Sequence, residues 1–315
     1  MELRAIKSVF CIFHSFNITI IFLGIVSSFP VISMPDCTLM IRYNNHYEFY
    51  IKGTDVHVMN AIRRVILSET VTLAIHDVFI TQNTSVMPDE VLSQRLGLIP
   101  LRVDPEEIDL REEAKATKPD LKRLTGMTAR FRLHVINTSE NDIITVYSGD
   151  LIPVDRKSVR PVYNNIPIVK LGRNQEIELE CIAKVGRGKD HAKWSPVSTI
   201  AYKIMPVIDV ADTCNSCGEC IDACPFHCLR MELGKPVLRG IGIYDCTLCR
   251  ICVRSCPQRA LSIEPSNNSY ILRIDLIGQL TIQELLEQTK LIFESKLDDL
   301  INRIEEALKE TTANQ

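Results

Sequence analysis

The chain has 315 residues, of which 46% are hydrophobic and 24% charged, and its formal net charge is -3. This length allows two or three domains, and the composition is typical of a globular chain and excludes a largely disordered one. The slightly acidic balance excludes the strongly basic surface that wraps nucleic acid, so we expect no direct DNA binding.

The first 33 residues form an apolar leader. No residue from Ser8 to Pro35 carries a formal charge. Such a stretch is typical of a membrane anchor or a cleaved signal sequence. However, polar residues such as His14 and Asn17 interrupt it, and the twin arginine that exports folded proteins is missing. We therefore favour Met34 as the true start, with 1–33 a mis-assigned extension, and keep the anchor and the signal sequence as alternatives.

A β-hairpin follows at residues 37–53, where apolar and polar residues alternate on both sides of Asn44-Asn45. We expect this hairpin to have one apolar face, made by Leu39, Ile41, Tyr43, Tyr47, Phe49 and Ile51.

A helix is predicted after Asp55, which serves as its N-cap. Apolar residues recur at helical spacing and predict a buried stripe. Another face carries Asn60, Arg63 and Arg64. We interpret these three residues as contacts to partner proteins, because such an edge suits docking onto carboxylates or carbonyl groups. A solvated face is the alternative.

Residues 81–205 contain short apolar stretches separated by polar, turn-rich segments. This pattern predicts a β-rich middle domain.

Eight of the twelve cysteines form two runs of the pattern Cys-x2-Cys-x2-Cys-x3-Cys-Pro, in residues 206–265. The runs repeat at a constant offset of 32 positions, as from Cys214 to Cys246. This is the spacing of bacterial-type ferredoxins with two 4Fe-4S clusters, in which the fourth cysteine of each run binds the other cluster. We therefore predict Cys214, Cys217, Cys220 and Cys256 for one cluster, and Cys246, Cys249, Cys252 and Cys224 for the other.

Zinc is the main alternative metal for paired Cys-x2-Cys motifs. A zinc site would not explain why each run has three regularly spaced cysteines and a fourth before proline. Cys228 aligns with Ala260 in the repeat, and we interpret it as a small core residue outside the ligand sets. Thiolates that bind iron must stay reduced until the cluster forms, so we expect a reducing, cytoplasmic location.

A strand at 270–277 and then a long helix end the chain. Thr281 and Glu284 form a predicted capping box. An apolar stripe runs from Ile282 to Leu308, and we expect part of it to dock on another subunit. Packing of the stripe against the chain's own hairpin is the alternative. The stripe residues that we assign to a partner are Leu286, Phe293, Leu297, Leu300 and Ile304.

Three motifs together point to one family. Residues 58–69 (VMNAIRRVILSE), 95–101 (RLGLIPL) and 188–196 (GKDHAKWSP) occur in the order in which similar blocks occur in the alpha-like subunits of cellular RNA polymerases. With ferredoxin-like cysteines before a C-terminal helix, the chain resembles the archaeal members of that family that carry a ferredoxin domain. The similarity covers about residues 34–308.

The resemblance implies an α+β fold with a discontinuous dimerisation domain, 34–80 plus 266–315, into which the β-rich domain 81–205 and the ferredoxin-like domain 206–265 are inserted. It also implies a heterodimer with the small alpha-like subunit L, on which subunits N and P and the second-largest catalytic subunit assemble.

The resemblance implies no catalytic residue and no small-molecule substrate in this chain, and no Asp-x-Asp-x-Asp motif for magnesium is present. The clusters would then be structural or regulatory. The competing hypothesis is an electron-transfer subunit of a ferredoxin-type oxidoreductase. No dinucleotide fingerprint or radical motif accompanies the cysteines to support it.

Overall fold

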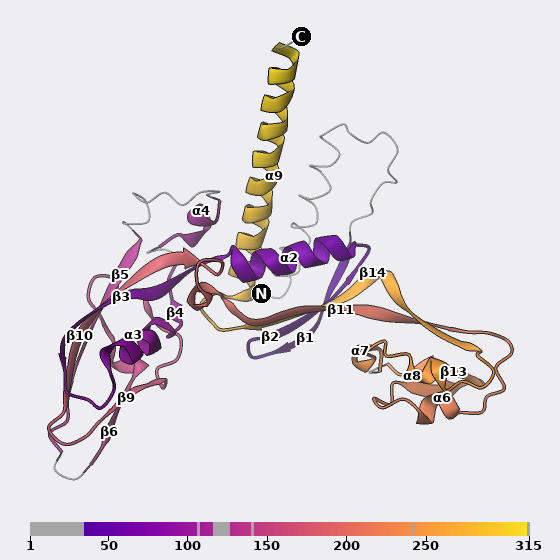
Figure 1. Cartoon of the computed structure of the whole chain (residues 1–315), viewed down its shortest axis with the longest axis horizontal. Helices are drawn as coiled ribbons and strands as arrows, with labels where there is room; N and C mark the ends of the chain where they lie inside the picture. Colours follow the sequence, from indigo (N-terminus) through magenta and orange to yellow (C-terminus); the bar gives the residue numbers. More distant parts are fainter. Residues whose placement is uncertain (1–34, 106–107, 116–126, 140–141, 241, 314–315) are drawn as a thin grey trace.

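The computed structural model describes residues 35–105, 108–115, 127–139, 142–240 and 242–313, so the expectations for residues 1–33 lie outside the described part of the chain. The described molecule is elongated. A β-rich body lies at one end and a small cysteine-bearing domain at the other, and one long helix projects from the sheet between them (Figure 1). No helix among the described residues is long and apolar enough to span a membrane.

The central sheet is antiparallel and joins the two ends of the described chain, with the strand order β1-β2-β14-β11. Helix α2 packs against it and buries Met59, Ile62 and Ile66. The elements are β1 (Asp36–Tyr43), β2 (His46–Lys52), α2 (Val56–Ser68), β11 (Val197–Val210) and β14 (Leu261–Leu276).

The predicted hairpin is confirmed, but the prediction of one apolar face on it is wrong for β1. Asn44 lies in the left-handed region and makes the turn, and Phe49 and Ile51 of β2 are fully buried. By contrast, Ile41 is 48% exposed and Tyr43 is 72% exposed. β1 is the edge strand of the sheet, and its register shifts between Leu39 and Ile41. Because of this shift, the side chains of residues 41–43 do not lie on the buried face to which Phe49 and Ile51 belong.

The long helix α9 (Ile282–Ala313) begins at the predicted capping box. The Thr281 amide donates to Glu284 Oε2 at 2.6 Å, and the Glu284 amide donates to Thr281 Oγ1 at 3.3 Å. The first turns are buried in the main core, and the remainder leaves the body of the molecule (Figure 1). At ~1.5 Å rise per residue, 32 residues give a rod of about 48 Å.

A second antiparallel sheet, with the order β3-β10-β5-β7, confirms the β-rich middle domain. Its inner face buries Phe131, Leu133 and Leu179. The sheet strands are β3 (Val71–Asn83), β5 (Thr128–Ile136), β7 (Ile152–Pro153) and β10 (Glu176–Arg187). Around the sheet lie α3 (Asp89–Gly97), β4 (Leu101–Arg102), α4 (Leu110–Ala114), β6 (Ile144–Tyr147), β8 (Arg160–Pro161), β9 (Pro167–Leu171) and the 3-10 turns Ser148–Asp150 and Ala192–Trp194.

The motif at 188–196 packs against both this sheet and α2. A Cβ at Gly186 would lie 2.4 Å from the Trp194 ring, and one at Gly188 would lie 2.1 Å from the Leu67 carbonyl oxygen. Lys193 lies over the Trp194 ring at 4.5 Å and donates to the Ile75 carbonyl at 2.9 Å. The motif therefore serves packing between elements.

Strands β11 and β14 continue beyond the central sheet as a two-stranded ribbon that carries the cysteine-bearing domain. The pairing is interrupted where Ile204 faces Tyr270 and Pro206 faces Pro265. The domain contains α6 (Glu219–Asp222), β12 (Leu229–Glu232), β13 (Lys235–Leu238), α7 (Gly242–Asp245) and α8 (Ile251–Arg254).

Candidate metal centre

The two cysteine runs fold into loops with matching backbone conformations. In each loop the residues on either side of the second cysteine have positive φ: Ser216 (60°) and Gly218 (83°) in the first, Leu248 (57°) and Arg250 (58°) in the second. Left-handed conformations cost L-residues roughly 1–2 kcal/mol each, and here they turn successive cysteines toward one centre. The internal repeat is therefore visible in the backbone as well as in the sequence.

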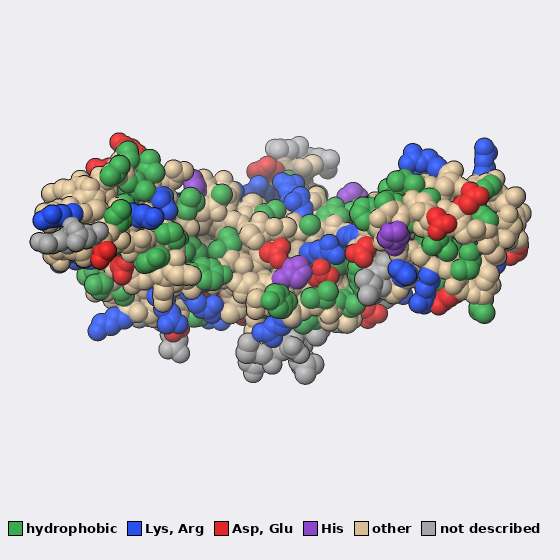
Figure 2. Space-filling view, turned by 90° about the horizontal axis from the view of Figure 1, so that it is seen from below, with side chains coloured by type: hydrophobic (Ala, Val, Ile, Leu, Met, Phe, Trp, Pro, Cys, Tyr) green, Lys and Arg blue, Asp and Glu red, His purple; other side chains and the backbone are tan. Residues whose placement is uncertain are grey.

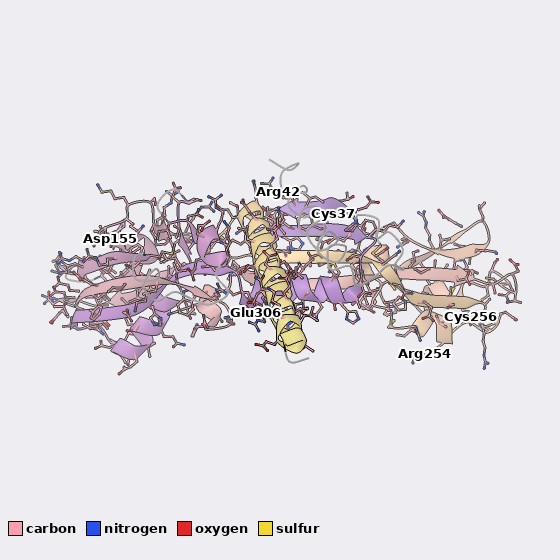
Figure 3. All side chains as sticks on the ribbon, turned by 90° about the horizontal axis from the view of Figure 1, so that it is seen from above. Cys37, Arg42, Asp155, Arg254, Cys256 and Glu306 are labelled. Atoms are coloured by element: carbon pink, nitrogen blue, oxygen red, sulfur yellow. The ribbon has the colours of Figure 1, made fainter. Side chains whose placement is uncertain are left out.

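The folded loops bring together the interleaved sets of cysteines. Cavity 1 is lined by Cys214, Cys217, Cys220 and Cys256. Cavity 2 is lined by Cys224, Cys246, Cys249 and Cys252. Each cavity thus receives three thiols from one run and the fourth from the other, which is the arrangement expected from the spacing. In Figure 3 the domain, marked by Cys256, lies at the opposite end of the molecule from Asp155.

Electrostatics within each cavity agree with this grouping. Burial raises the pKa of Cys220, and the charges of Cys256, Cys217 and Cys214 raise it further. Burial likewise raises the pKa of Cys252, with a contribution from Cys224. Closely spaced thiolates repel one another unless a cation is shared between them. The sets therefore suit a group that carries positive iron or zinc ions, which bind thiolates and release their protons.

Backbone amides donate to the fourth cysteine of each run. The Cys228 amide lies 3.3 Å from Cys224 Sγ, and the Ala260 amide lies 3.4 Å from Cys256 Sγ. Such N–H···S bonds stabilise thiolates and adjust the reduction potential of iron–sulfur clusters. Each cavity has four thiols that come from the two Cys-x2-Cys-x2-Cys-x3-Cys runs, held by equivalent loops, and these sets fit the ligand requirement of two 4Fe-4S clusters.

Cys228 is buried as expected from the sequence, with 1% exposure, but it also lines cavity 2. The sequence repeat placed it outside the ligand sets and gave no indication that its side chain would lie beside them. Two other cysteines, Cys37 and Cys181, are buried in the main core, and burial raises the pKa of each thiol to about 12. Neither residue lines the two cysteine cavities.

The polar residues predicted on α2 lie on one edge of the helix. Asn60 and Arg63 are half-buried and bonded to each other, with Arg63 donating to Asn60 Oδ1 at 3.0 Å, whereas Arg64 is exposed. The hydrogen bond between Arg63 and Asn60 therefore uses groups that we expected to contact a partner protein.

The predicted partner residues of α9 divide into two groups. Leu286 (1% exposed) and Phe293 (6% exposed) are buried in the chain's own core, so the structure corrects their assignment to a partner. Leu297 and Ile304 are half-buried and Leu300 is 51% exposed, on the part of the helix that projects from the body. In Figure 3 this part is seen obliquely and is marked by Glu306.

Gln288, which no sequence motif indicated, connects α9 to the start of β3. Its Oε1 accepts from the Val71 amide at 2.9 Å, and its Nε2 donates to the Val71 carbonyl at 3.3 Å. The side chain is 1% exposed. A polar residue inside the apolar stripe is the one signal that could have indicated it.

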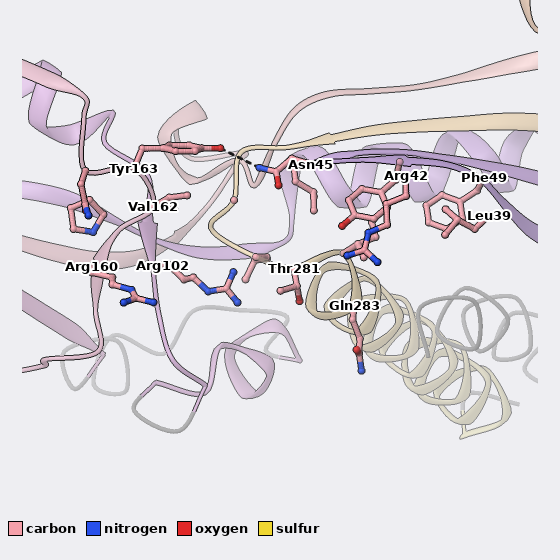
Figure 4. A pocket seen from close by; sticks show the side chains of 17 residues that line it. Leu39, Arg42, Asn45, Phe49, Arg102, Arg160, Val162, Tyr163, Thr281 and Gln283 are labelled. Atoms are coloured by element: carbon pink, nitrogen blue, oxygen red, sulfur yellow. Dashed lines mark hydrogen bonds between the residues drawn. The ribbon is translucent and has the colours of Figure 1, made fainter. Parts of the chain in front are cut away.

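A groove of about 610 Å³ lies where the β1–β2 hairpin, the start of α9 and the β-rich body meet. Figure 4 shows Arg42, Arg102 and Arg160 around it. Tyr163 crosses the junction, accepting from Asn45 Nδ2 at 3.2 Å and donating to the Ile277 carbonyl at 3.1 Å. Elsewhere, Figure 2 shows acidic and basic side chains interspersed on the face seen from below.

Comparison with known proteins identifies both inserted regions. Residues 78–207 match the family model of the RNA polymerase Rpb3/RpoA insert domain, and residues 213–261 match that of the 4Fe-4S dicluster domain. The second match favours iron–sulfur clusters over zinc for the cysteine cavities.

Relatives match most of the chain. DNA-directed RNA polymerase subunit Rpo3 of Methanothermobacter thermautotrophicus is 36% identical over 84% of this chain and 97% of its own length. Rpo3 of Archaeoglobus fulgidus is 30% identical, with 87% and 99% covered. The rpac1 subunit of RNA polymerases I and III of Dictyostelium discoideum is 31% identical, with 82% and 80% covered.

Proposed function

The chain belongs to the Rpo3 family of DNA-directed RNA polymerase subunits, and from this membership we propose that it is a non-catalytic assembly subunit of an archaeal-type polymerase. As a family member it is a component of a nucleotidyltransferase complex. In the proposal it pairs with the small alpha-like subunit L through a discontinuous dimerisation domain. The pair then forms the platform for subunits N and P and the second-largest catalytic subunit in the cytoplasm.

The observation that carries this proposal is the projecting half of α9. Its apolar residues recur at helical spacing, and Leu300 is 51% and Leu308 61% exposed. Continuous apolar stripes on a helix pack against a partner helix in most cases. The stripe continues from the part of α9 that is buried in the chain's own core, so a partner would extend that core along the helix.

The polar edge of α2 is the second proposed contact. Arg64 is exposed and Arg63 is half-buried beside Asn60. An arginine edge suits carboxylates and backbone carbonyl groups of a neighbouring subunit.

For the cysteine domain we propose two 4Fe-4S clusters, one bound by Cys214, Cys217, Cys220 and Cys256 and one bound by Cys246, Cys249, Cys252 and Cys224. Bound clusters supply an internal cross-link between the two halves of the repeat, because each half provides ligands to both. Folding of this domain is thereby coupled to iron. The alternative role as an electron-transfer oxidoreductase subunit is not favoured, because the relatives that match most of the chain are polymerase subunits.

The test is co-expression of the full chain with the small alpha-like partner. Replacement of both Leu300 and Ile304 by Asp places charges on the stripe and removes two apolar contacts worth about 1.5–3 kcal/mol each. We expect at least about a hundredfold loss of affinity, measured by analytical ultracentrifugation.

The matched control is Asn302→Asp, because Asn302 is exposed and lies on the same part of α9 but off the stripe. It should bind like the wild type. Heterodimer formation by the double variant at wild-type affinity would defeat the proposed role of the stripe.

A further inference from the structure

The two cysteine cavities differ at one equivalent position. Four residues after Cys256, cavity 1 is lined by Ala260; four residues after Cys224, cavity 2 is lined by Cys228. The backbone around the two positions matches, since both residues donate an amide hydrogen bond to the preceding cysteine sulfur, at 3.4 Å and 3.3 Å. The second cavity therefore has a fifth thiol where the first has a methyl group.

This fifth thiol lies among the proposed ligands of its cluster. Cys228 is 1% exposed and forms one buried cluster with Cys224 and Cys246. Its Sγ contacts the Phe226 carbonyl oxygen at 3.7 Å, which is a weak hydrogen bond for a thiol. It also makes a side-chain hydrogen bond with Cys224, so the two thiols lie next to each other at the cavity wall.

A lysine from the central sheet lies close to the thiols of cavity 2. Lys203 of β11 donates to the Tyr244 carbonyl, close to Cys246. The positive charge of Lys203 interacts with both Cys246 and Cys228. Lys203 faces Ile271 in the part of β11 that belongs to the central sheet, so its bond links the Cys246 loop to that sheet.

We propose that Cys228 is a reserve ligand of the cavity 2 cluster, which replaces Cys224 when that thiolate is lost. In the exchange one iron–sulfur bond to Cys224 breaks and one to Cys228 forms. The proton of the Cys228 thiol passes to the leaving Cys224 thiolate, and the iron atoms keep their oxidation states. The inference rests on the proposed iron–sulfur function and extends it, because cavity 1 has no such ligand in Ala260.

Tethering makes the exchange efficient. A thiol four residues from the lost ligand, buried at the same cavity, has an effective concentration of millimolar or more, whereas external thiols must diffuse in. The cluster in cavity 2 should consequently survive the loss of its fourth cysteine, and the cluster in cavity 1 should not.

The test compares Cys224→Ser with Cys256→Ser in the full chain, reconstituted with iron and sulfide without oxygen. Iron and acid-labile sulfide are measured per chain, together with the electron paramagnetic resonance spectrum of the reduced protein. The wild type should hold about eight irons. We expect Cys224→Ser to keep this content and Cys256→Ser to lose one iron or a whole cluster.

Two further variants use the repeat as an internal control. Cys224→Ser combined with Cys228→Ala should lose iron as Cys256→Ser does, whereas Cys228→Ala alone should keep the wild-type content. Adding Ala260→Cys to Cys256→Ser should restore iron to cavity 1. The cluster remaining in each single-site variant reports that the domain has folded.

Equal iron loss in Cys224→Ser and Cys256→Ser would overturn the inference, as would full iron in the Cys224→Ser/Cys228→Ala variant. A wild-type chain that binds no iron would instead overturn the proposed iron–sulfur function itself.

Discussion

The two inserted domains are held together in different ways. The β-rich domain buries large side chains such as Phe131 and Leu133 in a core that is continuous with that of the central sheet. The described part of the cysteine-bearing domain has two small separate clusters of buried residues. One consists of Cys220, Leu229, Cys252, Leu261 and Ile263, and the other consists of Cys224, Cys228 and Cys246. A domain this small seldom buries enough apolar surface to fold without disulfides or metals. We therefore expect one domain to depend on packing and the other on bound iron–sulfur clusters.

Removal of iron should have the largest effect, and it should destabilise only the cysteine-bearing domain. Structural metals contribute on the order of 10 kcal/mol to small domains, which exceeds what the five-residue cluster supplies. After anaerobic chelation we expect the amides of β12 and α8 to lose protection in hydrogen-exchange mass spectrometry. Those of β5 and β10 should keep theirs. Unchanged protection throughout 211–260 would show that packing suffices there.

A cavity in the core of the β-rich domain should destabilise that domain and leave the iron content of the cysteine-bearing domain unchanged. Leu133 is fully buried, and Leu133→Ala should lower the free energy of unfolding of the β-rich domain by about 2–5 kcal/mol through the lost contacts and the cavity left behind. Iron content should stay at the wild-type value. The control is Phe79→Ala on β3, where the side chain is 58% exposed and the expected change is within about 0.5 kcal/mol. Iron loss in Leu133→Ala would show that the two domains are not stabilised independently.

The grouping of the cysteines in the cysteine-bearing domain could be predicted from the sequence, because the residues that determine it lie close together along the chain. The cysteines and the proline of each run lie within 214–225 or 246–257, and the second run follows the first at an offset of 32 residues. The folded loops bring together the expected sets of cysteines. The fifth thiol was missed because the repeat shows only which positions match, and the wall of a cavity is formed by residues from several loops.

The body of the molecule was less predictable, since its decisive contacts are distant in sequence. Helical periodicity gave the face of α9 that is apolar, but it could not show where the helix leaves the core. Leu286 and Phe293 therefore looked equivalent to Leu300. The bulge in β1 and the bond between Gln288 and Val71 depend on pairing that no local pattern encodes.

The smallest predicted effect concerns pH and the central sheet, which both domains adjoin. His46 Nδ1 lies 2.5 Å from Asp275 Oδ1, and this hydrogen bond raises the pKa of His46, although burial opposes it. Because the folded-state pKa lies above the unfolded value near 6.5, the stabilisation is complete below about pH 6.5 and is lost as pH rises through the folded-state pKa.

We expect the difference in melting temperature between the wild type and His46→Gln to be larger at pH 6 than at pH 8.5, by a few degrees at most. Iron content should not change, because His46 lies in the central sheet, remote from the cavities. A difference that grows with pH would contradict the assignment of the Asp275 contact.

The most direct measurement is anaerobic purification of the tagged full chain from its native cells, with quantification of co-purifying subunits and iron. We predict the catalytic polymerase subunits in equimolar amounts and about eight irons per chain, two clusters of four. A chain that purifies with redox enzymes and without polymerase subunits would contradict the assignment as an iron–sulfur assembly subunit.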